Sequence, residues 1–168
     1  MNKSTGKKTL IILIIALAIM LFAFYSLNKP KSSEEMKNVE AITLEPKYSV
    51  VKEEVTYYNN IKGYLAKPKD SGEYPGVIMI HEWWGLNENI KEMAEKLASQ
   101  GYIVLAVDLY EGQATEDATK ARELSSSVRE NPNDAIVNMK AAFSYLKEEQ
   151  EADKIASLGW CFGGGQSL

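Results

Sequence analysis

One segment near the end of the chain constrains the fold most, because a strand-like run leads directly into a glycine-rich turn. The apolar run Lys154 to Leu158 predicts a short β-strand, and the residues after it read G-W-C-F-G-G-G. The single cysteine of the chain, Cys161, has Gly159 two residues before it and Gly163 two residues after it. This is the cysteine form of the G-x-S-x-G turn, in which a strand bends sharply into a helix and presents a nucleophile. Side chains at the two glycine positions would clash with such a tight backbone.

The chemistry of this turn depends on where the thiol points. At the first residue of a helix, free backbone N–H groups and the helix dipole favour the thiolate form of Cys161. The alternative is a buried cysteine that acts as a small apolar side chain beside a flexible glycine loop. The agreement of strand, spacing and glycines favours the nucleophile.

The amino-terminal part of the chain predicts a membrane segment. Residues Leu10 to Phe24 are uninterrupted apolar residues, and the stretch extends to Leu27, about the length that spans a bilayer. Lysines at positions 3, 7 and 8 precede it and predict a cytoplasmic amino terminus. We therefore expect a signal anchor or transmembrane segment at 1–27, a polar tether at 28–46 and an extracytoplasmic domain at 47–168. A cleaved signal peptide with an exported domain, or a buried soluble helix, is the alternative.

The domain itself shows the order of an α/β fold. Two β-rich runs around Asn59-Asn60 predict a hairpin over about 48–67, and continuous apolar runs at 75–80 and 102–107 predict strands buried on both faces. Helices are predicted from Asn87, as the N-cap, to Gly101, over 114–128 and over 135–147, before the strand at 154–158. Met93 is among the apolar positions of the first helix, and Ile136 and Phe143 are among those on one face of the third. This order predicts the amino-terminal part of a doubly wound, mostly parallel sheet with helices on both faces.

Composition narrows the classes of function. A net charge of −4 gives no basic surface for nucleic acid. One cysteine and one histidine exclude an internal disulfide and make a classical zinc site improbable, and no cofactor is expected. The glycines at 159–165 do not form the G-x-G-x-x-G pattern of a dinucleotide site and follow the third buried strand rather than the first.

Three motifs in order, I-H-E-W-W-G-L-N, V-D-L-Y and L-G-W-C-F-G-G-G, resemble the dienelactone hydrolase family of the α/β-hydrolase fold. The resemblance covers about residues 48–168. It implies a hydrolase of small esters or lactones, with Cys161 as the nucleophile that forms a thioacyl enzyme. It also implies that Glu82 interacts with the resting cysteine and assists thiolate formation.

The same resemblance implies an oxyanion hole made by the backbone N–H groups of Trp83 and Phe162. Trp84 and Tyr110 are weaker candidates, because aromatic residues beside strand ends can line an acyl pocket or belong to the core. The residues alone favour a structural role for His81, as a strand-end histidine satisfied by backbone groups. Asp108 is expected to order its own loop.

Two departures from the family pattern lead to further expectations. The substrate-binding arginine that the family carries after D-L-Y falls on Gly112, which puts a carboxylate-bearing substrate in doubt. The histidine base and aspartate that the family places after the nucleophile are absent from these 168 residues. We therefore expect a shortened or partial hydrolase without esterase activity of its own. The alternative is a membrane-anchored binding or scaffold domain, or a decayed gene product, that keeps part of the fold.

Overall fold

The computed structural model of the chain describes residues 45–167. Within this range no helix combines the length and the apolar character that crossing a bilayer requires. The membrane segment predicted at 1–27 lies outside the described residues, as does nearly all of the predicted tether.

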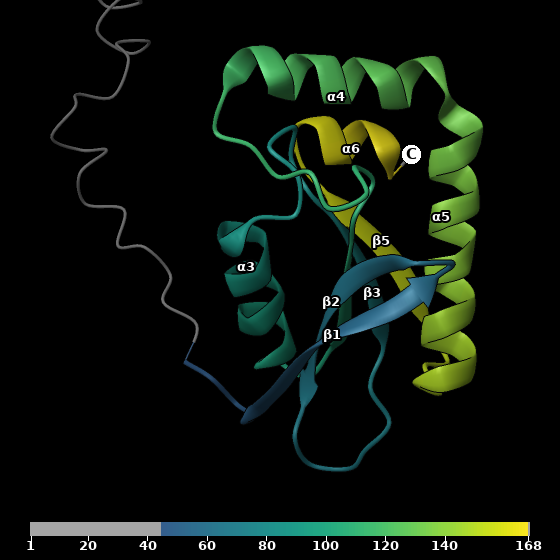
Figure 1. The fold of residues 1–168 in the computed structure, drawn as a ribbon. Helices are drawn as coiled ribbons and strands as arrows, with labels where there is room; N and C mark the ends of the chain where they lie inside the picture. The colour runs from purple at the N-terminus through teal and green to yellow at the C-terminus, as the bar shows by residue number, and fades with distance from the viewer. Residues whose placement is uncertain (1–44, 168) are drawn as a thin grey trace, which may run out of the picture. The chain divides into compact units, whose positions relative to one another are not determined.

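The described residues form a five-stranded sheet with helices on both faces (Figure 1). The elements in chain order are β1 (Val50–Tyr58), β2 (Ile61–Pro68), β3 (Gly76–Ile80), α3 (Glu88–Ala98), β4 (Ile103–Val107), α4 (Ala118–Glu130), α5 (Pro132–Ser144), the π-helical turn η1 (Tyr145–Glu149), β5 (Ile155–Gly159) and α6 (Phe162–Gln166). In space the strands follow the order β1-β2-β4-β3-β5.

The sheet is mixed, whereas the sequence predicted a mostly parallel one. β3 lies parallel to both β4 and β5, but β2 pairs antiparallel with both β1 and β4. The reason is the predicted hairpin, which the structure confirms. Asn59 turns the chain with φ +46, a conformation that asparagine tolerates, and β2 then adds to the free edge of β4.

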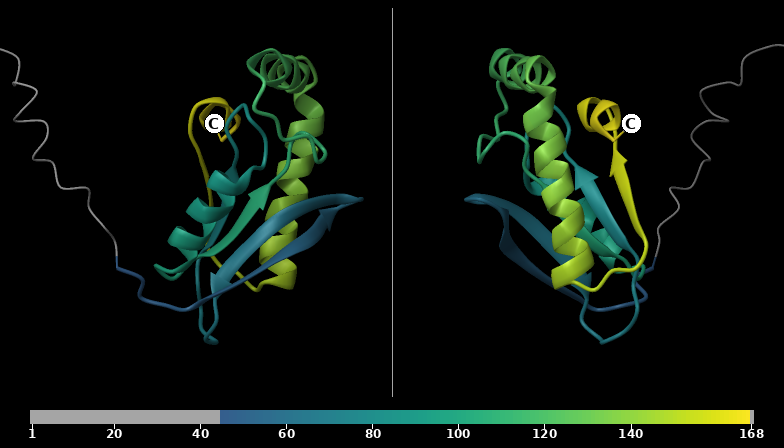
Figure 2. Two further views of the ribbon diagram at one scale, coloured as in Figure 1. Left: turned by 60° about the vertical axis from the view of Figure 1, so that its left-hand side comes forward. Right: turned by 90° about the vertical axis from the view of Figure 1, so that its right-hand side faces the viewer.

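Each face of the sheet has its own hydrophobic core. Helix α3 covers one face and packs Ile90, Ala94 and Ala98 against the strands. Asn87 caps this helix as predicted, since its side chain accepts a hydrogen bond from the N–H of Ile90. The opposite face is covered by α5 and η1 (Figure 2). The strands β3 and β4, buried on both sides, therefore read as continuous apolar runs in the sequence.

Helix α5 is rotated away from the orientation that its apolar periodicity predicts. The sequence placed Ile136 and Phe143 on the core face, but these side chains are 48% and 49% exposed. The buried face instead carries small residues and Asn138, whose amide donates to the Asp108 carbonyl and whose oxygen accepts from the hydroxyl of Tyr57. A buried amide loses free energy unless it is hydrogen-bonded, so these partners fix the rotation. Met93 of α3 is likewise exposed, contrary to prediction.

The exposed face of α5 continues onto β5. An apolar groove of about 420 Å³ runs between them, with Met139 and Phe143 of the helix and Ile155 of the strand among its lining residues. β5 pairs with β3 alone and is the last strand of the described sheet. Its residues are half-buried or exposed, in contrast to the fully buried β3 and β4.

Candidate functional site

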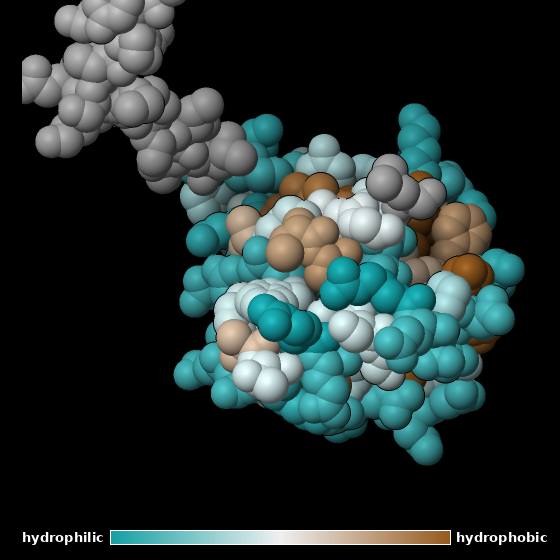
Figure 3. Space-filling model, turned by 90° about the horizontal axis from the view of Figure 1, so that it is seen from above, coloured by the Kyte–Doolittle hydropathy of each residue, from teal (hydrophilic) through white to brown (hydrophobic). Residues whose placement is uncertain are grey.

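The predicted site residues lie at one edge of the sheet, where the parallel strands β3, β4 and β5 end. The turn after β3 carries Glu82, Trp83 and Trp84, the loop after β4 carries Tyr110, and the turn after β5 carries Cys161. Seen from this edge, the surface is mainly hydrophilic or intermediate, and strongly hydrophobic residues occupy only small areas (Figure 3). Side chains far apart in the sequence thus share one edge, which is where α/β sheets bind their ligands.

The turn at Cys161 has a strained backbone. Cys161 lies between β5 and α6 with φ +56 and ψ −123, a conformation that L-residues rarely adopt. A Cβ atom at Gly159 would come within 2.5 Å of the Gly163 carbonyl carbon and oxygen. A Cβ atom at Gly163 would come within 2.5 Å of the Ile80 carbonyl oxygen. The two glycines are therefore sterically required. Strain of this kind collects at functional sites.

Cys161 is a free cysteine and is exposed to solvent. Among residues 45–167 it makes no hydrogen bond, and in particular none to the half-buried Glu82. The contact between Glu82 and the resting cysteine, which the family resemblance implies, therefore stays a prediction.

The two candidate oxyanion donors have free N–H groups. Within the described residues, neither the Trp83 nor the Phe162 amide donates a hydrogen bond to a protein acceptor. Phe162 is the first residue of α6, where an amide has no partner within the helix. Trp83 lies inside a turn that closes with a 3.2 Å hydrogen bond from the N–H of Gly85 to the carbonyl of Glu82. Two unpaired backbone donors at one edge of the sheet are what an oxyanion hole needs.

The turn around Trp83 depends on Gly85. This residue has φ +87, and a Cβ atom on it would lie 2.9 Å from the carbonyl oxygen of Gln113. The ring of Trp83 lies against that of Trp84, with centroids 4.7 Å apart. Close contact with the loop after β4 therefore excludes a larger residue at Gly85 and holds the turn in place.

His81 links the turn after β3 to the loop after β4, a position that the sequence did not predict. Its ring is fully buried, and Nδ1 lies 2.6 Å from the carbonyl oxygen of Glu82 while Nε2 accepts a 3.1 Å hydrogen bond from the N–H of Leu109. The predicted satisfaction by backbone groups is thus confirmed. Burial lowers the pKa of His81, and this desolvation outweighs the hydrogen bond to Glu82 and the nearby Asp108 carboxylate. In this arrangement neither ring nitrogen of His81 is free to act as a general base.

An aromatic cluster surrounds this histidine. The ring of Phe162 stacks on His81 at 5.8 Å and 17°, and the ring of Tyr110 meets it edge-on at 4.5 Å. Tyr110 is buried, and its hydroxyl has no hydrogen-bond partner in the described part of the chain. The structure therefore places Tyr110 in the core. The predicted role of Trp84 in an acyl pocket stays a prediction.

The carboxylate of Asp108 orders its own loop, as predicted. Its two oxygens accept hydrogen bonds from the N–H groups of Tyr110 and Gly112 at 2.8 and 2.6 Å. Gly112, the position where the family resemblance implies an arginine, has φ +88. An arginine there would adopt a conformation that side chains other than glycine rarely take. The loop is thus built around the glycine.

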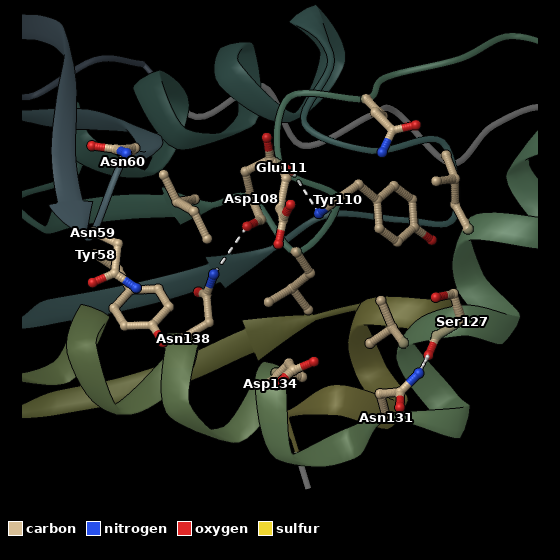
Figure 4. A pocket seen from close by; sticks show the side chains of 16 residues that line it. Tyr58, Asn59, Asn60, Asp108, Tyr110, Glu111, Ser127, Asn131, Asp134 and Asn138 are labelled. Carbon is tan, nitrogen blue, oxygen red and sulfur yellow. Dashed lines mark hydrogen bonds between the residues drawn. The ribbon is translucent and has the colours of Figure 1, made fainter.

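A separate cavity of about 530 Å³ lies beside this loop (Figure 4). It is bounded by the β1–β2 turn, the loop after β4 and the α4–α5 junction, and its polar side chains include Asn60, Glu111, Asn131 and Asp134. Of the predicted site residues, only Tyr110 lines it. The cavity is therefore distinct from the edge that carries Cys161. Within residues 45–167 no cluster of histidine, cysteine or carboxylate side chains could hold a metal ion.

Comparison with known proteins agrees with this geometry. The family model described as the dienelactone hydrolase family matches residues 61–168. Protein usf of Aquifex pyrophilus is 39% identical over 114 residues, which cover 64% of this chain and 48% of that protein. A provisionally named carboxymethylenebutenolidase of Aquifex aeolicus (strain VF5) is 36% identical over 110 residues, covering 62% of this chain and 47% of the relative.

A solved structure named m3DLH superimposes with a TM-score of 0.65 at 29% sequence identity, covering 71% of this chain and 52% of that one. The described fold is therefore that of an α/β-hydrolase. The chain spans about half the length of the curated relatives it matches.

Proposed function

Because this chain belongs to the dienelactone hydrolase family, we propose that it carries the nucleophile and the oxyanion hole of a hydrolase of small esters or lactones. The observation that carries the proposal is the strained turn at Cys161, with φ +56 between two glycines that tolerate no side chain. The relative named as a carboxymethylenebutenolidase supports a lactone as one substrate class.

The reaction begins with the Cys161 thiolate. In this proposal Glu82 assists its formation, and the thiol proton passes to solvent. Sulfur attacks the carbonyl carbon of the ester, a C–S bond forms and the carbonyl electron pair moves onto oxygen. The N–H groups of Trp83 and Phe162 stabilise this oxyanion. The C–O bond to the leaving group then breaks, which releases an alkoxide or phenolate and leaves a thioacyl enzyme.

Turnover needs a base to activate water, and the one histidine of these 168 residues is not free to act as one. This histidine, His81, is buried with both nitrogens in hydrogen bonds. We therefore expect the 168-residue chain to be acylated once and to stop there. A burst of at most one p-nitrophenolate per chain should follow the addition of p-nitrophenyl acetate, without steady-state turnover. Sustained turnover that Cys161→Ala abolishes would overturn the expectation of inactivity, and a Cys161 that is never acylated would overturn its role as nucleophile.

The loop after β4 indicates a substrate without a carboxylate. Gly112 offers no cation, and the Asp108 and Glu111 carboxylates lie on the same loop. A negatively charged acyl group therefore lacks the ion pair that an arginine would supply. Acylation of Cys161 by neutral p-nitrophenyl acetate should be faster than acylation by the monoester p-nitrophenyl succinate. Equal or inverted rates would contradict this preference.

A second candidate is a binding or scaffold domain on the hydrolase fold. The same burst experiment separates the two. A thiol that reacts with iodoacetamide but never with an activated ester fits a binding domain, since alkylation requires only an accessible thiolate. Acylation of Cys161 fits the hydrolase.

We also propose that residues 1–27 anchor the domain on the extracytoplasmic side of a membrane, a proposal that rests on the apolar run from Leu10 to Leu27 and the lysines before it. The single, exposed Cys161 makes the topology measurable. A membrane-impermeant maleimide should label intact cells that express the chain, and a Cys161→Ala chain should stay unlabelled. Labelling that appears only after lysis would contradict the topology. Release of the chain by alkaline carbonate would contradict the anchor.

A further inference from the structure

His81 holds a single tautomer, which its two partners dictate. Its Nε2 faces the N–H of Leu109, and a backbone N–H can only donate, so Nε2 is the unprotonated acceptor. Its Nδ1 faces the carbonyl oxygen of Glu82, which can only accept, so Nδ1 carries the hydrogen. The ring therefore links the loop after β4 to the turn after β3 as a neutral Nδ1–H imidazole.

The carbonyl that receives this hydrogen bond belongs to the same peptide group as the N–H of Trp83. No cis peptide occurs in the described part of the chain, so the Glu82–Trp83 peptide is trans and planar. In such a group the C=O and the N–H point in opposite directions. Fixing the Glu82 carbonyl therefore fixes the direction of the Trp83 N–H. The N–H of Gly85 donates to the same carbonyl and closes the turn, so this oxygen accepts two hydrogen bonds, one of them from the His81 ring.

We propose that His81 is a positioning residue for the oxyanion hole, whose Nδ1–H aims the Trp83 N–H through the shared Glu82–Trp83 peptide. The proposal rests on the proposed function, because it takes Trp83 as an oxyanion donor. Phe162, whose N–H is the second candidate donor, stacks its side-chain ring on the same imidazole. One buried ring thus sets the orientation of one donor and contacts the residue that bears the other.

The tautomer can be observed directly, because the chain contains one histidine. The full chain, labelled with ¹⁵N-histidine and solubilised in a mild detergent, should show one imidazole spin system. We expect a protonated, pyrrole-type signal at Nδ1 and a pyridine-type signal at Nε2. A protonated Nε2, or rapid exchange between the two tautomers, would overturn the proposal whatever the activity of the chain.

The functional consequence is tested by comparing two reactions of Cys161. Acylation by p-nitrophenyl acetate passes through an oxyanion, whereas alkylation by iodoacetamide does not. The ratio of the two rates therefore reports oxyanion stabilisation and cancels changes in thiolate content or accessibility. Cys161→Ala gives the background of both reactions.

Two variants test the roles of the two ring nitrogens one at a time. The amide nitrogen of His81→Asn falls near the position of Nδ1 and can still donate to Glu82, whereas the amide of His81→Gln reaches the position of Nε2 and cannot. We expect His81→Gln to lower the acylation-to-alkylation ratio by about 10- to 100-fold, and His81→Asn to keep the ratio within about threefold of the original chain. Val77→Ala, a buried change on the α3 side of the sheet, controls for destabilisation alone and should leave the ratio unchanged.

An equal fall in both rates for His81→Gln would show that His81 acts only on the fold or the thiol, and would overturn the proposal. If the original chain is alkylated but never acylated, the proposed function fails instead, and the imidazole spectrum still decides the position of the hydrogen. The spectrum also decides the matter if both variants fail to fold.

Discussion

The neighbouring parallel strands β3 and β5 each end in a turn that carries part of the proposed site, but the two turns are held in different ways. β3 lies between two strands and is buried over its whole length, whereas β5 pairs with β3 alone and its residues are half-buried or exposed. The turn after β3 is held by a hydrogen-bonded histidine, and the turn after β5 is held by the close approach of backbone to backbone at its glycines.

In the described residues, contacts with the end of β3, and not burial of β5, hold the strained turn at Cys161. Gly163 fits against the carbonyl groups of Ile80 and His81, so the end of β3 provides the wall against which the Cys161 turn is built. β3 thereby supports both halves of the proposed site. Changes in β3 should consequently disturb the molecule more than matching changes in β5.

The largest effect is expected from a matched pair on one face of the sheet. Met79 of β3 and Leu158 of β5 are register partners, but Met79 is 1% exposed and Leu158 is 41% exposed. Met79→Ala should lower the free energy of unfolding by about 2–5 kcal/mol, because it leaves a cavity in a closed core. Leu158→Ala should cost less than about 1 kcal/mol. Urea unfolding of the two variants measures both, and similar losses would mean that β5 is covered in solution.

The next largest effect concerns the close contact between Gly163 and the end of β3. Gly163→Ala would place a Cβ atom 2.5 Å from the Ile80 carbonyl oxygen and 2.7 Å from that of His81. Backbone atoms cannot swing away as side chains do, so we expect a loss of about 2–3 kcal/mol in stability and a changed alkylation rate at Cys161. Gly165→Ala, where a Cβ atom meets nothing within 4 Å, is the control in the same helix and should be neutral or slightly stabilising. Equal behaviour of the two variants would show that α6 does not rest on β3.

The histidine at the end of β3 should make stability depend on pH. Burial lowers its pKa in the folded chain below the ordinary value of 6.5, so the unfolded chain binds the proton first as the pH falls. Stability is therefore full above about pH 6.5 and declines below it, by at most about 1.4 kcal/mol per pH unit.

The charged and titratable groups around this ring are few. The Asp108 carboxylate lies 3.9 Å from Nε2 and opposes the shift, and Tyr110 is uncharged in this range. The lowered pKa of Glu95, caused by hydrogen bonds from Tyr64 and Lys52, acts below pH 4.5 and outside the window from pH 7 to 5. The difference in unfolding free energy between the original chain and His81→Asn should therefore change across this window. A constant difference would exclude a buried, neutral His81.

The smallest effect should come from the strain at Cys161. A φ of +56 is unfavourable in free energy for an L-residue but not for glycine. Cys161→Gly should therefore be more stable than Cys161→Ala by about 1 kcal/mol, after the larger entropy of the unfolded glycine chain is subtracted. Thermal unfolding of the two thiol-free variants makes the comparison. An alanine variant as stable as the glycine variant would indicate an unstrained turn in solution.

Local patterns predicted much of this molecule. The Asn59-Asn60 hairpin, the apolar runs of β3 and β4 and the strand before Cys161 all form within a residue or two of their predicted positions. Hydrophobic periodicity and turn-forming residues are short-range properties. They can therefore be recognised in the sequence without knowing which segments pack together. The boundaries of α4 were less accurate. It begins at Ala118 after the cap Asp117, four residues later than predicted.

The rotation of α5 could not be predicted from the same patterns. Its apolar residues at 136 and 143 indicated a core face, but the bonds of Asn138 to Tyr57 and Asp108 turn small residues inward. Those partners are 81 and 30 residues away in the sequence. Pairings over such distances are decided by the packed fold and leave no periodic signal. The mixed sheet could not be predicted from local patterns either, because it depends on which strand the hairpin pairs with.

The sequence by itself determined the position of the glycine-flanked turn at Cys161, the family and the presence of a single histidine in these 168 residues. Each depends on residue type and spacing, since a backbone that bends this tightly admits only glycine at positions 159 and 163. The tertiary structure decided that His81 is buried between two loops, that its Nδ1 faces the Glu82 carbonyl, and that β3 is the wall behind Cys161. These are relations between segments that only packing brings together. A sequence alone does not distinguish a histidine with free ring nitrogens from one in which both nitrogens are hydrogen-bonded.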